Sequence, residues 1–161
     1  IIVLYKNGDK AIIKQENNRA IYIFKGVKDL KEGFSYDIQV NQIYDFYGLK
    51  EIKDFNILKE NSSFKNYKDL FLDGSKIDIF DFKYENEVIT NLKGFITKGN
   101  LQINGGKTIK LFAKDKNILP KDGSTIDILN AQLGSFRGNM QIIFHTKDDY
   151  KELKWAKKAD C

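Results

Sequence analysis

The sequence has one cysteine, Cys161 at its last position, one proline, Pro120, and one histidine, His145. A single cysteine can form neither an internal disulfide nor a cysteine-based zinc site. Nucleophilic catalysis of the Ser-His-Asp or Cys-His kind needs a base beside the nucleophile, and no such partner is evident for His145. We therefore interpret His145 as a strand-end surface residue and expect the chain not to be an enzyme.

Other patterns are missing as well. No apolar run approaches the roughly 18 to 20 residues that a membrane span requires, and no signal-peptide pattern is visible. Since the chain begins at Ile1 without a methionine, the sequence does not exclude an export signal or lipid anchor further upstream, and it leaves the localisation of the protein open. The turn Asn104-Gly105-Gly106 lacks the strand-loop-helix context of a nucleotide-binding glycine motif.

The acidic residues offer no clear metal site. Five carboxylates cluster in the middle of the chain without the spacing of an EF-hand loop, and paired carboxylates for glycosidase chemistry are equally unsupported. They are Asp73, Asp78, Asp81, Glu85 and Glu87. We expect no metal and no cofactor.

What the chain does contain is enough apolar and aromatic residues to bury a core, 42% and 13% of the total. The net charge is +5, from 27 basic and 22 acidic residues. Residues 87–150 carry 9 basic and 6 acidic residues, an excess of three, whereas residues 1–60 carry 10 and 9, an excess of one. Any attraction to a polyanion therefore belongs mainly to the C-terminal half.

An internal repeat sets the expected architecture. Residues 33–52 align without a gap to residues 123–142, an offset of 90, and both copies contain the pattern Phe-x-Gly-x-x-Glu/Gln-Ile. Residues 20–24 resemble residues 108–112 once an insertion is allowed, and both segments alternate at the period of a half-buried strand. The repeat predicts an all-β fold of two tandem five-stranded barrels.

We expect barrel 1 in residues 1–60, with its first strand truncated, and barrel 2 in residues 87–150. The second barrel should have strands over 88–97, 100–104, 107–113, 124–133 and 139–145, with a hairpin turn at Asn104-Gly105-Gly106. The linker, 61–86, spaces apolar residues at three and four from Ser62 to Phe71, which predicts a short amphipathic helix. The tail, 151–161, is expected to continue a second brief helix that starts near Asp148.

The recurring pattern Leu-Lys-x-Gly, an alternating strand, then aromatic-x-Gly-Leu-x-x-Ile, as in Leu30–Gly33 and Phe46–Ile52, resembles OB-like (oligonucleotide/oligosaccharide-binding) domains of bacterial secreted endonucleases and envelope proteins. The resemblance covers most of residues 8–60 and 87–146. It implies a non-catalytic accessory or nucleic-acid-binding module, often exported.

OB folds bind through an exposed strand face with stacking aromatic and cationic side chains. We expect weak binding of single-stranded nucleic acid without strong sequence preference. The alternative is a structural module, or one that binds a protein or glycan in a bacterial exported or envelope protein. Phe46 and Phe136 recur at one turn position and look architectural. The candidate binding residues are Arg19, Tyr22, Phe24, Tyr47, Lys50, Lys107, Lys110, Phe112 and Arg137.

Overall fold

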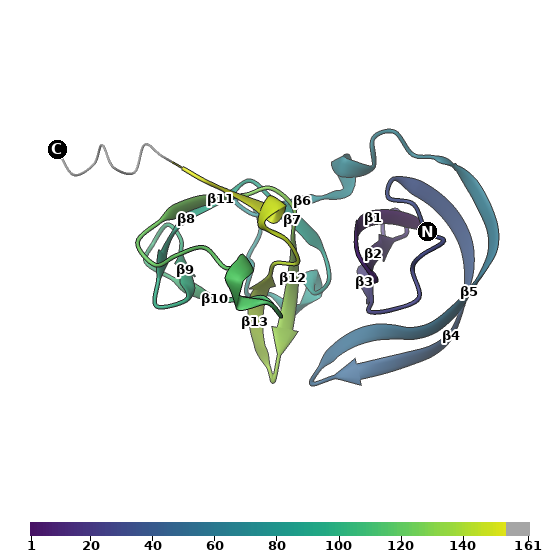
Figure 1. The fold of residues 1–161 in the computed structure, drawn as a ribbon, viewed down its shortest axis with the longest axis horizontal. Coiled ribbons are helices and arrows are strands. Elements are labelled where there is room, and N and C mark those ends of the chain that lie inside the picture. The colour runs from purple at the N-terminus through teal and green to yellow at the C-terminus, as the bar shows by residue number, and fades with distance from the viewer. Residues whose placement is uncertain (154–161) are drawn as a thin grey trace.

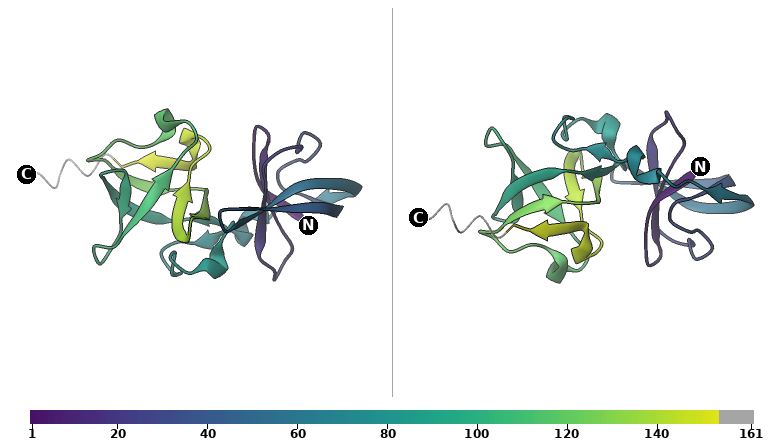
Figure 2. Two further views of the ribbon diagram at one scale, coloured as in Figure 1. Left: turned by 90° about the horizontal axis from the view of Figure 1, so that it is seen from below. Right: turned by 90° about the horizontal axis from the view of Figure 1, so that it is seen from above.

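The computed structural model describes residues 1–153, which form two strand systems side by side along the long axis of the molecule (Figures 1 and 2). The first unit contains β1 (Ile2–Asn7), β2 (Lys10–Lys14), β3 (Ala20–Ile23), β4 (Phe34–Phe46) and β5 (Leu49–Ser63). The second contains β6 (Leu72–Asp73), β7 (Val88–Thr90), β8 (Leu92–Thr97), β9 (Asn100–Gln102), β10 (Thr108–Phe112), β11 (Thr125–Ile128), β12 (Ala131–Phe136), β13 (Asn139–Ile143) and β14 (Tyr150–Glu152).

The helices of residues 1–153 are all short 3-10 turns, and none is long and apolar enough to cross a membrane. They are η1 (Tyr67–Leu70), η2 (Phe82–Tyr84), η3 (Lys116–Ile118) and η4 (Lys147–Asp149). The prediction of an all-β chain is confirmed.

The first unit is a closed, OB-like barrel with the strand order β1-β2-β3-β5-β4. Strands β3 and β5 run parallel, and Ile2 of β1 pairs with Ser35 of β4 to close the ring. Alternate residues of each strand point inward, so Val3, Ile13 and Ile23 join one buried apolar cluster. Strands β4 and β5 are much longer than the other strands, and their hairpin curves around β1, β2 and β3 and reaches toward the second unit (Figure 1).

The second unit is a nine-stranded sheet in the order β14-β11-β8-β9-β10-β13-β12-β7-β6. Its apolar cluster includes Ile109, Leu111 and Ile142. The predicted strand over 88–97 is present as β7 and β8, interrupted at Asn91. The predicted strand over 124–133 is present as β11 and β12 and reaches Phe136.

Tight turns of the same type end the β4–β5 hairpin and the β12–β13 hairpin. Tyr47 and Gly48 join β4 to β5 with φ values of 52° and 99°, and Arg137 and Gly138 join β12 to β13 with φ values of 51° and 84°. Two successive positive φ values are typical of the turn that matches the right-handed twist of two-residue hairpins. The predicted hairpin turn at residues 104–106 is also present, between β9 and β10.

Both helix predictions are wrong. Strand β5 continues to Ser63, and η1 is the only helical turn between Ser62 and Phe71, because Phe64, Tyr67 and Leu70 pack against the barrel from an extended chain with one 3-10 turn. Near the C-terminus, η4 is followed by β14, whose backbone pairs with β11 instead of forming helical hydrogen bonds. The rest of the predicted tail, residues 154–161, lies outside the described residues.

Candidate functional site

The two units are joined by a buried ion pair. The ammonium group of Lys14 on β2 lies 2.7 Å from Oε1 of Glu87, which precedes β7, and the two side chains are only 10% and 4% exposed. The second carboxylate oxygen of Glu87 accepts a hydrogen bond from the backbone N–H of Ala20 at 3.2 Å. Because a buried charge is tolerated only when it is paired, these contacts fix one face of the barrel against the second unit.

A second polar contact joins the two ends of the chain. The hydroxyl of Tyr5 on β1 donates to Oδ1 of the fully buried Asp149 at 2.8 Å. Asp149 also accepts hydrogen bonds from the side chain of Asn130 at 2.8 Å and from the backbone N–H of His145 at 2.7 Å. Burial raises the pKa of Asp149 above its usual range, although the hydrogen bonds from His145 and Tyr5 oppose this.

The turn between β4 and β5 meets the turn between β12 and β13 at the lower edge of the interface (Figure 1). The backbone N–H of Arg137 donates to the carbonyl oxygen of Tyr47 at 3.1 Å. The guanidinium carbon of Arg137 lies 4.6 Å from the ring centroid of Tyr47 and 5.2 Å from that of Phe136. The rings of Phe46 and Phe136 lie 6.0 Å apart. This contact holds two exposed loops together.

Above these turns the units enclose a cleft of about 590 Å³. This volume is typical of small-molecule sites. Tyr44 and Phe112 are 45% and 43% exposed, so the cleft opens to solvent. Six aromatic side chains drawn from both units line it: Tyr22, Phe24, Tyr44, Phe46, Phe112 and Phe136.

Gly134 on β12 lies beside two residues that line the cleft, Leu49 and Ile143. A Cβ atom at this position would lie 2.6 Å from Cδ1 of Ile143 and 3.7 Å from Cδ2 of Leu49. Leu49 belongs to the hairpin of the first unit and Ile143 to β13 of the second. The absence of a side chain at Gly134 therefore leaves room for the side chain of Ile143 on the neighbouring strand, whereas Leu49 lies at an ordinary contact distance.

The histidine is part of this cleft and is not the surface residue that the sequence suggested. The ring of His145 lies between those of Tyr5 and Tyr22, with centroid distances of 5.7 and 5.9 Å. Its Nε2 lies 2.8 Å from Oε1 of Gln132. Since the amide nitrogen of Gln132 donates to Asn86 at 3.0 Å, its oxygen must be the acceptor, so Nε2 carries the proton. Burial lowers the pKa of His145 to about 4.

The most unusual polar group in the cleft is Glu51 on β5. It is 8% exposed, and burial raises the pKa of its carboxyl to about 7, although the nearby Lys10 opposes this. Within residues 1–153, no hydrogen bond or ion pair to this carboxyl is found, whereas Glu87 on the same interface has both. Gln141, at the matching position of the repeat, also lines the cleft and is 6% exposed.

The structure brings some of the predicted binding residues together. Tyr22, Phe24 and Phe112 line the cleft, and Tyr47 and Arg137 form the turn contact at its edge. Lys110 pairs with Gln141 across β10 and β13, which places it on the face of the sheet that carries Phe112.

Three other predicted residues lie elsewhere. Lys50 is on the opposite face of the hairpin from Glu51 and pairs with Asp45 at 3.2 Å. Lys107 lies 5.7 Å from the ring of Phe80. The guanidinium group of Arg19 donates to the backbone oxygen of Phe82 at 2.8 Å.

Sequence reasoning missed three kinds of cleft residue. Phe46 and Phe136 were interpreted as architectural, and Glu51 and Gln141 were seen only as part of the repeat pattern. The signal for the second pair was present, since a polar residue recurs just before the buried isoleucine in both copies. His145 carried no such signal, because its neighbours come from β1 and β3 of the other unit.

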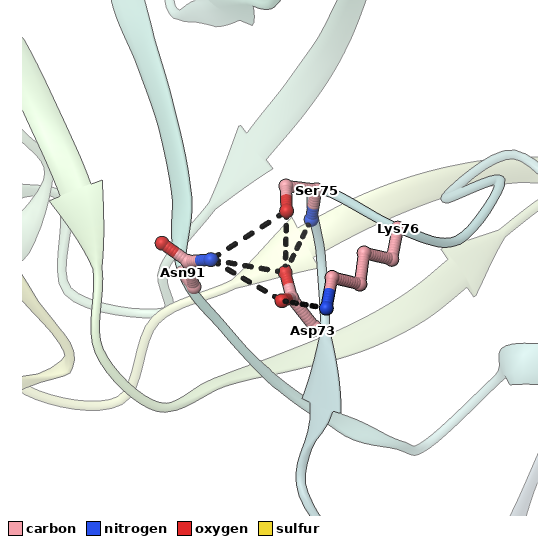
Figure 3. Close-up of polar contacts among 4 residues, drawn as sticks. All are labelled: Asp73, Ser75, Lys76 and Asn91. Atoms are coloured by element: carbon pink, nitrogen blue, oxygen red, sulfur yellow. Dashed lines mark hydrogen bonds and ion pairs between the residues drawn. The ribbon is translucent and has the colours of Figure 1, made fainter.

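Carboxylates of the linker accept hydrogen bonds from neighbouring backbone and side-chain groups. Asp73 accepts hydrogen bonds from the hydroxyl of Ser75 at 2.6 Å and its N–H at 2.9 Å, and from the side chain of Asn91 at 3.2 Å (Figure 3). The contacts from Ser75 keep the pKa of Asp73 below its usual range. Asp81 caps η2. No group of three metal-ligating side chains is found among residues 1–153.

No protein-family model and no curated protein matches the sequence. Among solved structures, the chain is similar to a murine DNA-binding protein bound to double-stranded DNA, with a TM-score of 0.43 and 11% identity over 90% of this chain and 84% of that chain. It is also similar to the Ifi202 HINa domain in complex with 20bp double-stranded DNA, with a TM-score of 0.39 and 15% identity over 94% and 92% of the two chains.

A third similar structure is the p204 HINb domain, with a TM-score of 0.38 and 11% identity over 89% of this chain and 84% of that chain. None of these three is an accessory domain of a bacterial secreted endonuclease. All three TM-scores lie below 0.5, a similarity too low to transfer a function.

Proposed function

We propose that the chain is a binding module that holds single-stranded nucleic acid in the cleft between its two units. One observation carries the proposal: aromatic rings from both units line a cleft that is open to solvent and has Lys10 and Lys114 in its wall. Single strands are bound by aromatic side chains on which bases stack and by cationic groups that contact the phosphates. In a duplex the base faces are already stacked, so the cleft favours unpaired bases.

We propose further that both units are OB modules. The second unit contains the order β8-β9-β10-β13-β12, with β10 and β13 parallel, as β3 and β5 are in the first unit. Leu92 pairs with Ile128 and Ile89 pairs with Ala131 in one continuous antiparallel register across the two strand breaks, which supports closure of a second barrel.

Equivalent glycines support the same assignment. The N–H of Gly33 donates to the carbonyl oxygen of Val3 at 2.8 Å, and the N–H of Gly123 donates to that of Ile96 at 2.8 Å. Their φ values are 84° and 90°. On this assignment, barrel 1 ends near residue 60 and barrel 2 covers residues 87–150, with the linker between them.

Stacking and phosphate contacts carry little sequence information. We therefore expect a weak affinity that depends little on the base sequence and falls as the salt concentration rises. For single strands, the slope of log K against log salt is about −0.7 per neutralised phosphate.

Replacing Phe112 by alanine is expected to weaken binding of single-stranded DNA by about 1 to 3 kcal/mol, the contribution of one stacked base. The measurement is fluorescence anisotropy with a labelled oligonucleotide at low salt and over a salt series. Phe95→Ala is a matched control, because Phe95 is 44% exposed, Phe112 is 43% exposed, and Phe95 on β8 lies outside the cleft. The proposal is wrong if no single strand binds at low salt or if both variants lose affinity equally.

A glycan is the second candidate, since apolar rings beside a free carboxyl and a free amide also suit a sugar ring. The same titration with neutral oligosaccharides separates the two ligands. Glycan binding should be insensitive to salt, whereas nucleic-acid binding should weaken steeply.

A further inference from the structure

The cleft contains hydrogen-bonding groups that the protein itself leaves free. Gln132 and Ser135 are both engaged, with Asn86 and Glu85. Among residues 1–153, by contrast, the side chains of Glu51, Gln141 and Tyr22 have no hydrogen bond, and each is less than 9% exposed. Their polar atoms reach the solvent of the cleft, because Oδ1 of Asp127 is the only fully buried side-chain oxygen or nitrogen without a partner among the described residues. Three free polar groups that line one cavity are therefore available to hydrogen-bond a polar ligand there.

We propose, on the basis of the function proposed above, that this cavity holds one unstacked guanine base of a single strand, recognised at its N1–H and N2–H edge by the carboxylate of Glu51. Because Tyr22 pairs with Glu51 across β3 and β5, their side chains are neighbours on the cavity wall. The aromatic rings of the cleft cover the faces of the base.

The choice of guanine follows from the pattern of donors and acceptors. An ionised carboxylate is a pure acceptor with two oxygens. Guanine presents two adjacent donors, N1–H and the N2 amino group, whereas adenine and cytosine present one donor group beside an acceptor nitrogen. Thymine and uracil place one donor between two carbonyl oxygens. A carboxylate without competing protein donors therefore fits guanine and repels the acceptor edges of the other bases.

The remaining free groups match the rest of the base. The amide of Gln141 and the hydroxyl of Tyr22 can donate to O6, which is an acceptor. Burial, with Glu51 nearby, raises the pKa of Tyr22, so this hydroxyl keeps its proton. The ammonium group of Lys10 is held by the carbonyl oxygen of Phe24 at 2.9 Å and, with Lys114, supplies positive charge for the flanking phosphates.

The test uses labelled oligothymidylates in which one central base is guanine, adenine, cytosine or hypoxanthine. We expect the strand with guanine to bind about tenfold more tightly than the all-thymine strand, the lower range for a bidentate base contact. Hypoxanthine keeps N1–H and lacks the N2 amino group, so its strand should bind with intermediate affinity.

Glu51→Gln should remove the preference for guanine, since an amide offers one donor and one acceptor. The amide matches adenine, so the strand with adenine should become the tightest. Glu60→Gln is the control: it makes the same chemical change on β5 at an exposed residue outside the cleft and should leave the order of affinities unchanged.

The preference should also weaken as the pH falls below about 7, where the carboxyl of Glu51 becomes protonated and gains a donor. The charged and titratable groups that share the cavity with Glu51 come from every neighbouring element. They are Lys10, Tyr22, Tyr44, Lys114 and His145.

The outcomes separate this inference from the proposed function. If all strands bind with equal affinity and Phe112→Ala weakens them all, the nucleic-acid function stands and guanine recognition is wrong. If the guanine preference survives in Glu51→Gln, Glu51 is not the recognising group. If no strand binds at low salt, both proposals fail together.

Discussion

Replacing Glu87 by alanine should destabilise the folded protein by about 3 to 5 kcal/mol, because it leaves the ammonium group of Lys14 buried without its partner. It also removes the acceptor of the Ala20 N–H. Urea unfolding followed by far-UV circular dichroism measures the change in free energy. The cleft should lose its ligand affinity in parallel, because the same ion pair fixes the two units against each other.

A control and a rescue variant accompany this measurement. Glu16 is exposed, so Glu16→Ala should change the stability by less than about 0.5 kcal/mol. Combining Glu87→Leu with Lys14→Met replaces both charges with apolar side chains and should recover most of the loss. A loss in Glu87→Ala no larger than in Glu16→Ala would show that the ion pair contributes nothing to stability.

Two groups in the cleft should have opposite effects on the pH dependence of stability. Burial lowers the pKa of His145 from 6.5 to about 4. The contribution of His145 to the free energy of unfolding is therefore present above pH 6.5 and lost as the pH falls towards 4. Burial raises the pKa of Glu51 from 4.5 to about 7, so its contribution is present below pH 4.5 and lost as the pH rises through 7. Each shift corresponds to about 3 kcal/mol.

In the unsubstituted protein these two contributions largely cancel between about pH 4 and pH 7. In Glu51→Gln only the His145 contribution remains, so the stability relative to the unsubstituted protein should fall on acidification. In His145→Gln the relative stability should instead fall as the pH rises. Urea unfolding over this pH range measures both slopes. Two variants with the same sign of slope would contradict the assignment.

Much of the second unit could be predicted because its strands have one buried and one exposed face. Along β10, Ile109 and Leu111 are 2% and 4% exposed, whereas Phe112 is 43% exposed, as the alternation of the sequence indicates. The turns at Gly48 and Gly138 were predictable for a different reason: a position with positive φ restricts the residue type strongly enough to be visible in the sequence.

The linker could not be predicted from its spacing. Phe64, Tyr67 and Leu70 follow the three-and-four spacing of a helix, but they pack against the barrel from an extended segment and one 3-10 turn. Packing overrides local preference in such a short segment. The strand Tyr150–Glu152 was missed for the same reason, since its partner β11 lies far back in the sequence.

The cleft was the hardest feature to predict, because it arises only when the two units dock. Tyr22 and Phe112 were recognised as outward-facing residues of separate barrels, and docking turns both toward one cavity. His145 and Glu51 acquire their shifted pKa values from burial in that cavity. No pattern within either copy specifies this burial.

The hydrogen bond between Tyr5 and Asp149 joins residues 144 positions apart in the chain. Contacts inside the barrel span fewer residues: β1 and β2 pair residues 3 to 12 positions apart, and the pair of Ile2 and Ser35 that closes the barrel spans 33. Closing a long loop is entropically less favourable than closing a short one, and contacts of high sequence separation form slowly. During folding we therefore expect each unit to acquire its strands first, and the cleft to be the last part of the molecule to assemble.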